Sequence, residues 1–211
     1  MGRTKPRAAT QRLEAAKLLS MRRRQERRRA LLIFGIGGAV VAALVTSAVV
    51  VLVQAQQQKV SLQNALKQPI AGVQTFKNLS RNHVAAVPQY KQNPPVGGDH
   101  SAAYLNCGVY RLTVDAGRAV HALEHGAVWV TYSTALPAGQ LTKLTEQAQR
   151  QKSEILSPYE SLPAPIVASA WGLQLKVSDA SDPRLATFLA KYQQGPQTPE
   201  KGAGCNNGTT Q

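Results

Sequence analysis

The sequence predicts an α+β protein in which a single N-terminal transmembrane helix is followed by a small antiparallel-sheet domain with flanking helices. Two observations support this prediction. A run of 24 residues without a charged side chain, residues 30–53, lies near the N-terminus. After it, short stretches rich in β-branched and aromatic residues are mixed with helix-like stretches without strict alternation, which favours an α+β domain with helices packed on an antiparallel sheet.

The apolar run, ALLIFGIGGAVVAALVTSAVVVLV, would measure about 36 Å as a helix, against a hydrocarbon core of roughly 30 Å. A core helix of a globular domain is one alternative, but such a helix is rarely apolar on every face. A cleaved signal peptide is the other, because Val53-Gln54-Ala55 is a passable cleavage site, although the apolar region of a signal peptide is normally shorter. We therefore expect an uncleaved anchor.

The charge of the N-terminal segment sets the expected orientation. Residues 1–29 contain eleven Lys and Arg against two Glu, in a chain with a formal net charge of +14. Basic residues stay on the cytoplasmic side of a membrane helix, so we expect a plasma-membrane protein with a cytoplasmic N-terminus and an extracytoplasmic C-terminal domain. The tail is expected to contact the lipid bilayer. Nucleic acid is not expected as a partner, because no aromatic residue precedes Phe34.

Four segments are therefore expected. They are a basic cytoplasmic tail (1–29), a transmembrane helix (30–53), a polar stalk (54–75) and an extracytoplasmic α+β domain (76–211).

Within the last segment, β-rich composition predicts strands, and periodic apolar residues predict helices, one of them with Pro183 in its first turn. The strands are expected at 109–114, 127–132, 165–171 and 173–177, and the helices at 138–153 and 183–192. The region 80–106, with three prolines and two glycines, is expected to be irregular coil lying over the sheet.

The chain has two cysteines, Cys107 and Cys205. A disulfide between them would fit an oxidising compartment and would stabilise the domain by about 4 to 5 kcal/mol in the chain-entropy model. Two free thiols and a pair of soft metal ligands are the alternatives. A nucleophilic Cys107 is disfavoured, because no CxxC motif or flanking basic residue lowers its pKa.

All four histidines fall within 43 residues, and two of them belong to the motif His121-Ala-Leu-Glu-His125. On a helix capped by Asp115 and ended by Gly126, His121, Glu124 and His125 would share one face, close enough to chelate one ion. On a strand, His121 and His125 would be roughly 13 Å apart, too far for one metal.

The histidine cluster predicts a divalent transition-metal site for copper or zinc, since imidazole suits both. Its expected ligands are His83, His100, His121, Glu124 and His125. The alternative is a non-catalytic cell-envelope interaction module that binds another envelope protein, in which hydrogen-bonded histidines fasten the coil to the sheet.

The motif HxxEH is also that of inverted zincins, which makes a metallohydrolase a third hypothesis. Such an enzyme needs the motif on a long helix, with a further Glu ligand downstream, whereas Gly126 and a predicted strand follow here at once. The sequence has no phosphate-cradling glycine loop and no dinucleotide fingerprint. An enzymatic function is therefore not supported, and no catalytic residue is predicted.

Five motifs in a specific order, NHVAAVPQYKQNPPVGGDH, NCGVY, VHALEHGAVWVTY, PIVASAWG and PEKGAGC, resemble an actinobacterial family of membrane-anchored proteins, domain-of-unknown-function family 3105. The likeness covers about residues 76–208. It implies an uncharacterised exported domain behind a single anchor. The family pattern includes the four histidines, Glu124 and both cysteines, and it departs here only in Gly97, which replaces a serine. No activity comes with the resemblance.

Overall fold

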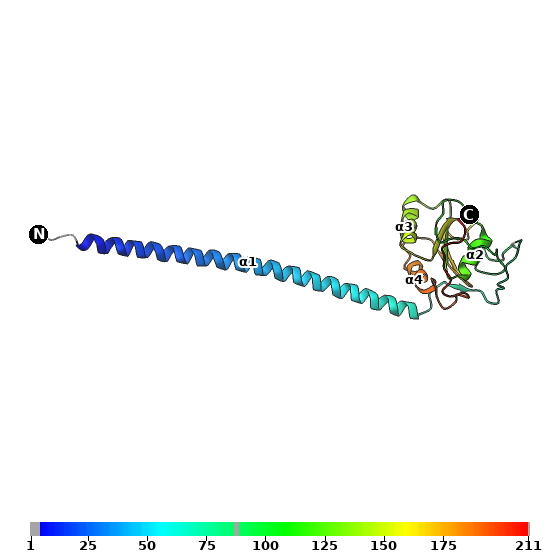
Figure 1. Ribbon diagram of the computed structural model, residues 1–211, viewed down its shortest axis with the longest axis horizontal. Coiled ribbons are helices and arrows are strands. Elements are labelled where there is room, and N and C mark those ends of the chain that lie inside the picture. The colour runs from blue at the N-terminus through cyan, green and yellow to red at the C-terminus, as the bar shows by residue number, and fades with distance from the viewer. Residues whose placement is uncertain (1–4, 87–88, 211) are drawn as a thin grey trace. The chain divides into compact units, whose positions relative to one another are not determined.

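The computed structural model describes residues 5–86 and 89–210. The chain divides into two compact units, Met1–Val60 and Ser61–Gln211. The described residues of the first unit belong to α1 (Lys5–Lys67), which ends within the second unit. The second contains the remaining elements of Figure 1, namely β1 (Gln74–Thr75), β2 (Gly108–Val109), α2 (Ala116–Glu124), β3 (Val128–Tyr132), α3 (Ala138–Gln149), β4 (Glu154–Pro158), β5 (Ile166–Ala170), β6 (Leu173–Val177) and α4 (Pro183–Tyr192).

The predicted transmembrane helix requires a correction. Residues 30–53 are an internal part of α1 rather than a helix of their own, with basic residues before them and a glutamine-rich stretch after them. Across residues 5–86 and 89–210, no helix combines the length and the apolar character needed to cross a membrane. The predicted membrane anchor, and with it the predicted plasma-membrane localisation, is therefore wrong.

The second unit is α+β, as predicted, but its sheet is mixed rather than antiparallel. Six strands lie in the order β1-β6-β5-β3-β4-β2. The pairs β1–β6, β6–β5 and β5–β3 are antiparallel, whereas β3–β4 and β4–β2 are parallel. Helix α3 connects β3 to β4 and brings the chain back to the end of the sheet at which β3 begins. The two strands therefore run in the same direction.

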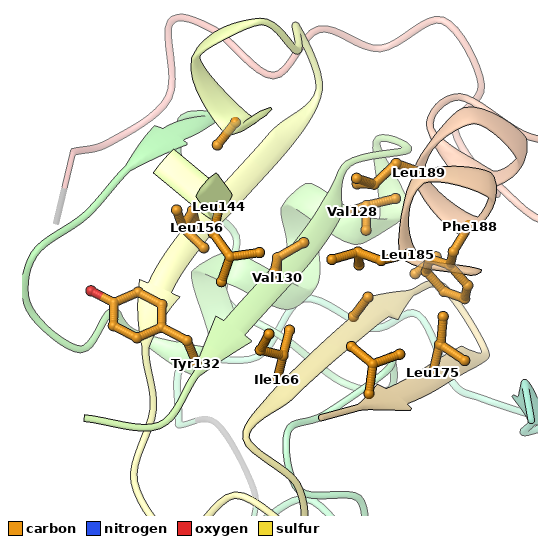
Figure 2. Packing of buried hydrophobic residues seen from close by; sticks show 14 of the residues in the cluster. Val128, Val130, Tyr132, Leu144, Leu156, Ile166, Leu175, Leu185, Phe188 and Leu189 are labelled. Atoms are coloured by element: carbon orange, nitrogen blue, oxygen red, sulfur yellow. The ribbon is translucent and has the colours of Figure 1, made fainter. Parts of the chain in front are cut away.

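Two hydrophobic clusters cover the two faces of the sheet. On one face, α3 and α4 pack against β3, β4, β5 and β6 through residues that include Val130, Leu144 and Phe188 (Figure 2). On the other face, α2 and the coil bury Trp129 and Leu123, and the indole Nε1 of Trp129 donates a hydrogen bond to the Ser157 hydroxyl at 2.9 Å. The central strand β3 is buried along its whole length, as expected for a strand covered on both faces.

The local signals predicted α4, β5 and β6 closely, and they missed β4. Strand β4 (EILSP) contains a single β-branched residue and ends in Pro158, so its sequence carries little β signal, although it pairs with both β3 and β2. Most of the predicted strand 109–114 is coil, and only Gly108–Val109 pairs with the sheet. The predicted coil before it is irregular wherever the structure describes it, with an isolated bridge between His83 and His100.

Candidate metal centre

Helix α2 carries two of the predicted donors, and its ends are fixed by local sequence. Asp115 caps the first turn, with its Oδ1 accepting a hydrogen bond from the Arg118 backbone N–H at 2.7 Å. At the other end, Gly126 has φ +93°, and the N–H groups of Gly126 and Ala127 donate to the carbonyls of Leu123 and Ala122. This is a Schellman motif, and it stops the helix directly after the HxxEH sequence.

The other two histidines of the cluster come from the coil. The N–H of His100 donates to the Asn82 carbonyl at 3.0 Å, and the N–H of Val84 donates to the His100 carbonyl at 2.9 Å. This parallel bridge holds His83 beside His100. Ring centroids of His83 and His121 are 4.6 Å apart in a stacked arrangement, and those of His100 and His121 are 4.9 Å apart.

Four predicted site residues therefore converge. His83, His100, His121 and Glu124 each offer one donor atom, and these atoms all lie within 4.8 Å of one another. His100, His121 and Glu124 are buried, whereas His83 is exposed. Three imidazoles and one carboxylate at this spacing could hold a transition-metal ion.

The two buried rings present their Nε2 atoms to the cluster. Nδ1 of His100 lies 2.7 Å from the Gly98 carbonyl, and Nδ1 of His121 lies 2.8 Å from the Ser101 carbonyl. Since a carbonyl only accepts, Nδ1 carries the proton in both rings, and each Nε2 is left with its lone pair when the ring is neutral. Backbone carbonyls orient metal-ligating histidines in the same way.

The contact between His100 and Glu124 is close without being a hydrogen bond. Nε2 of His100 lies 2.9 Å from Oε2 of Glu124, yet Nε2 has no hydrogen-bond partner in this buried place. With a proton on Nε2 the two groups form a buried ion pair. With a neutral His100, whose Nδ1 proton is directed at the Gly98 carbonyl, two lone pairs face each other, and a cation between them would satisfy both.

Burial keeps His121 neutral. Desolvation, together with the smaller effect of the neighbouring histidines, lowers the pKa of His121 to about 4, although the hydrogen bond to the Ser101 carbonyl acts in the opposite direction. The neutral imidazole is the form that binds metal.

His125, the fifth predicted ligand, is not part of the four-residue group. Its Nδ1 donates to the Gly204 carbonyl at 3.0 Å, and its Nε2 lies 3.3 Å from Oε2 of Glu200. His125 follows the last residue of α2 as its C-cap, so its ring leaves the face shared by His121 and Glu124. It still packs edge-on against His121, with ring centroids 4.6 Å apart.

Two charged residues that the sequence did not single out contact this site. Arg81 places its Nε 3.8 Å from Oε1 of Glu124, and its side chain is 56% exposed. Glu200 pairs with His125, and its backbone N–H donates to the Glu124 carbonyl at 3.1 Å. The position of Arg81, two residues before His83, was the only available signal. Glu200 lies too far away in the sequence to be found.

Cys107 and Cys205 form the disulfide, with their Cα atoms 5.3 Å apart. It joins the residue before β2 to the C-terminal segment that contacts His125. Neither cysteine is therefore a free thiol or a metal ligand, and the donors of the site are nitrogen and oxygen alone.

Residues 83–207 match the model of a family described as protein of unknown function, DUF3105. The chain belongs to this family. The DUF3105 match confirms the family identified from the five motifs, and its limits enclose all four histidines, Glu124 and both cysteines. No curated protein and no solved structure matches the chain.

Proposed function

We propose that this protein binds one divalent transition-metal ion, copper or zinc, through His83, His100, His121 and Glu124. The observation that carries the proposal is the set of four donors within 4.8 Å of one another. Three of them are buried, and His100 directs an unpartnered Nε2 at the Glu124 carboxylate. Buried polar atoms are normally hydrogen-bonded, so a shared cation would explain this arrangement.

The chemistry of the donors supports a metal of intermediate softness. Imidazole nitrogen suits zinc, copper, iron and nickel, whereas calcium and magnesium prefer sites made of oxygen alone. Both thiols are consumed by the disulfide, and thiolate or thioether ligands, which favour Cu(I), are not part of the cluster. Three nitrogens and one oxygen leave divalent copper and zinc as the metals to test first.

The four donor atoms need to move only slightly closer together to bind a zinc ion. Zinc ligands at 2.0 to 2.2 Å from the ion are roughly 3.3 Å apart in a tetrahedron. His100 and Glu124 are already at 2.9 Å, and the full set extends to at most 4.8 Å. Because the His83 side chain is exposed, it is the donor with the most freedom to adjust by side-chain rotation.

The test is the metal content of the full-length protein, measured by inductively coupled plasma mass spectrometry after reconstitution with copper or zinc and removal of free metal. We expect about one ion per chain and loss of binding in His100→Ala/His121→Ala. His125→Ala is the matched control, because His125 lies on the same segment but outside the four-residue group. A wild-type protein without bound metal would refute the proposal.

A structural role for the histidines is the second candidate. The imidazoles of His100, His121 and His125 each donate from Nδ1 to a carbonyl of the coil or the C-terminal segment, as expected of histidines that fasten these segments. In that case, histidine variants lower the melting temperature equally with and without a chelator. In the metal-binding case, the chelator lowers the melting temperature of the wild type and leaves His100→Ala/His121→Ala unchanged.

A further inference from the structure

The four donors of the cluster are unequal, and the difference lies in how firmly each is held. His100 is fully buried, and Glu124 and His121 are 2% and 5% exposed. Hydrogen bonds from Nδ1 to backbone carbonyls fix the rings of His100 and His121. Two histidines and one carboxylate therefore form a rigid inner set. This is the composition of sites that hold a metal on one side and leave other coordination positions open.

His83 differs from the inner set in its burial and in how its ring is held. Its backbone is held by the bridge to His100, whereas its side chain is exposed. Among the described residues, the contacts of its ring are the stacking on His121 and an edge contact with His100, at centroid distances of 4.6 and 5.0 Å. Ring contacts of this kind contribute only about 1 kcal/mol. The His83 ring can therefore turn away while its backbone stays in place.

A positively charged side chain, that of Arg81, also lies beside Glu124. Arg81 lies two residues before His83, and its Nε approaches Oε1 of Glu124 at 3.8 Å with more than half of the side chain in solvent. Once a metal takes up the charge of Glu124, the guanidinium keeps free donors that face solvent. Asp99, an acidic residue on the same coil, already accepts a hydrogen bond on its Oδ1 from the Asn82 side chain at 2.9 Å.

We propose that His83 is an exchangeable ligand and that its position on the metal takes a small carboxylate, which Arg81 assists in binding. A carboxylate oxygen coordinates the divalent ions that imidazole also binds, and a guanidinium fork matches the second oxygen. The inference rests on the proposed metal site and defines the class of ligand that this site would take. In the free state, the His83 imidazole fills the position.

The experiment uses full-length protein loaded with Co(II), because Zn(II) has a filled d shell and gives no visible spectrum. Acetate is added at constant ionic strength, maintained with perchlorate, so that electrostatic screening stays equal. We expect a saturable change in the Co(II) visible bands. In His83→Ala, the apparent Kd for acetate should fall by about tenfold, because a tethered competitor has been removed.

Arg81→Met should weaken acetate binding by about threefold, the effect of one exposed ion pair. Arg111→Met is the matched control, since Arg111 is also exposed but lines a different cavity with Leu112 and Thr113. Thermal melts of each variant establish that it is folded.

Two negative results have different meanings. If Co(II) bands appear but acetate leaves them unchanged in both the wild type and His83→Ala, the exchangeable position is refuted and the metal site stands. If the wild type gives no Co(II) bands and also retains neither copper nor zinc after reconstitution, the metal site itself is refuted, and the inference falls with it.

Discussion

The imidazole of His125 donates a hydrogen bond to the carbonyl of Gly204 at 3.0 Å, and Gly204 directly precedes the disulfide-bonded Cys205. The backbone of Cys205 is fixed as well, because its carbonyl accepts from the Cys107 N–H at 2.8 Å. The disulfide therefore anchors the C-terminal segment at the point where it meets the end of α2. Through Glu200, whose N–H donates to the Glu124 carbonyl, the same segment reaches the candidate metal centre.

Removal of this disulfide should destabilise the domain strongly. The bond closes a loop with a sequence separation of 98 residues, for which the chain-entropy model gives about 4 to 5 kcal/mol. We expect Cys107→Ser/Cys205→Ser to lower the free energy of unfolding by an amount of this order in urea titrations. Reduced wild-type protein serves as the control and should behave like the double variant. Equal urea midpoints for the oxidised wild type and the double variant would contradict the prediction.

Gly126 should not tolerate a side chain. Its φ of +93° is strained for any residue with a Cβ, and a Cβ there would lie 2.8 Å from Nε2 of Gln194 and 3.0 Å from Cγ2 of Thr198. Gly126→Ala is therefore expected to lower the free energy of unfolding by about 1 to 3 kcal/mol.

Gly139→Ala is the matched control, because Gly139 lies in α3 with nothing within 4 Å of the added Cβ. The control should gain about 0.4 to 1 kcal/mol. Similar melting temperatures for the two variants would show that the helix end is not constrained in this way.

The parts of the site that sequence could predict are those fixed by local signals. Asp115 and Gly126 define α2 by capping and by positive φ, and this alone brings His121 and Glu124 onto one helix face. The addition of His83 and His100 was predicted only from clustering of histidines in the sequence, since the coil that carries them has no periodicity. The bridge between them and the turn of His125 toward Glu200 depend on tertiary contacts.

The fold was predicted to a similar extent, and for a similar reason. The class and the elements with strong local patterns, such as α4 with Asp182 and Pro183 at its start, followed from the sequence. The direction of β4 did not, because a strand with one β-branched residue and a terminal proline has little pattern, and its pairing depends on the crossover through α3. The apolar run inside α1 predicted a membrane span from composition alone, and the structure does not support it.

Glu154 should make the domain less stable at alkaline pH. Burial raises the pKa of its carboxyl to about 8, only partly opposed by a hydrogen bond from Gln147, and Oε2 has no partner. The folded state thus holds a proton that the unfolded chain has already lost above about pH 4.3. The contribution to stability is complete below that pH and is lost as the pH rises toward and through 8.

Glu154→Gln removes this dependence, because the amide has nearly the same shape and no charge. We expect the variant to exceed the wild type by about 1 to 3 kcal/mol near pH 9, the range for a buried uncompensated polar group, and to match it near pH 4. Thermal melts across this range provide the measurement. A constant difference between the two proteins at every pH would show that Glu154 does not titrate as its burial requires.

The metal-free protein should also lose stability in acid, through His121. Its pKa is lowered to about 4 by burial, whereas a histidine of the unfolded chain titrates near 6.5. Between these values the unfolded state binds the additional proton, so the free energy of unfolding falls as the pH drops from about 6.5 to about 4 and depends little on this group above that window. The expected loss is on the order of 1 to 3 kcal/mol. His121→Gln should remove this acid loss. Glu154→Gln, the control, should retain it, because the effect of Glu154 has the opposite sign and extends from about pH 4.3 to about 8. Because protons compete with metal for the same imidazoles, saturating zinc should stabilise the wild type most above pH 6.5 and progressively less below it. An acid slope that is the same in the wild type and in His121→Gln would assign the transition to another group.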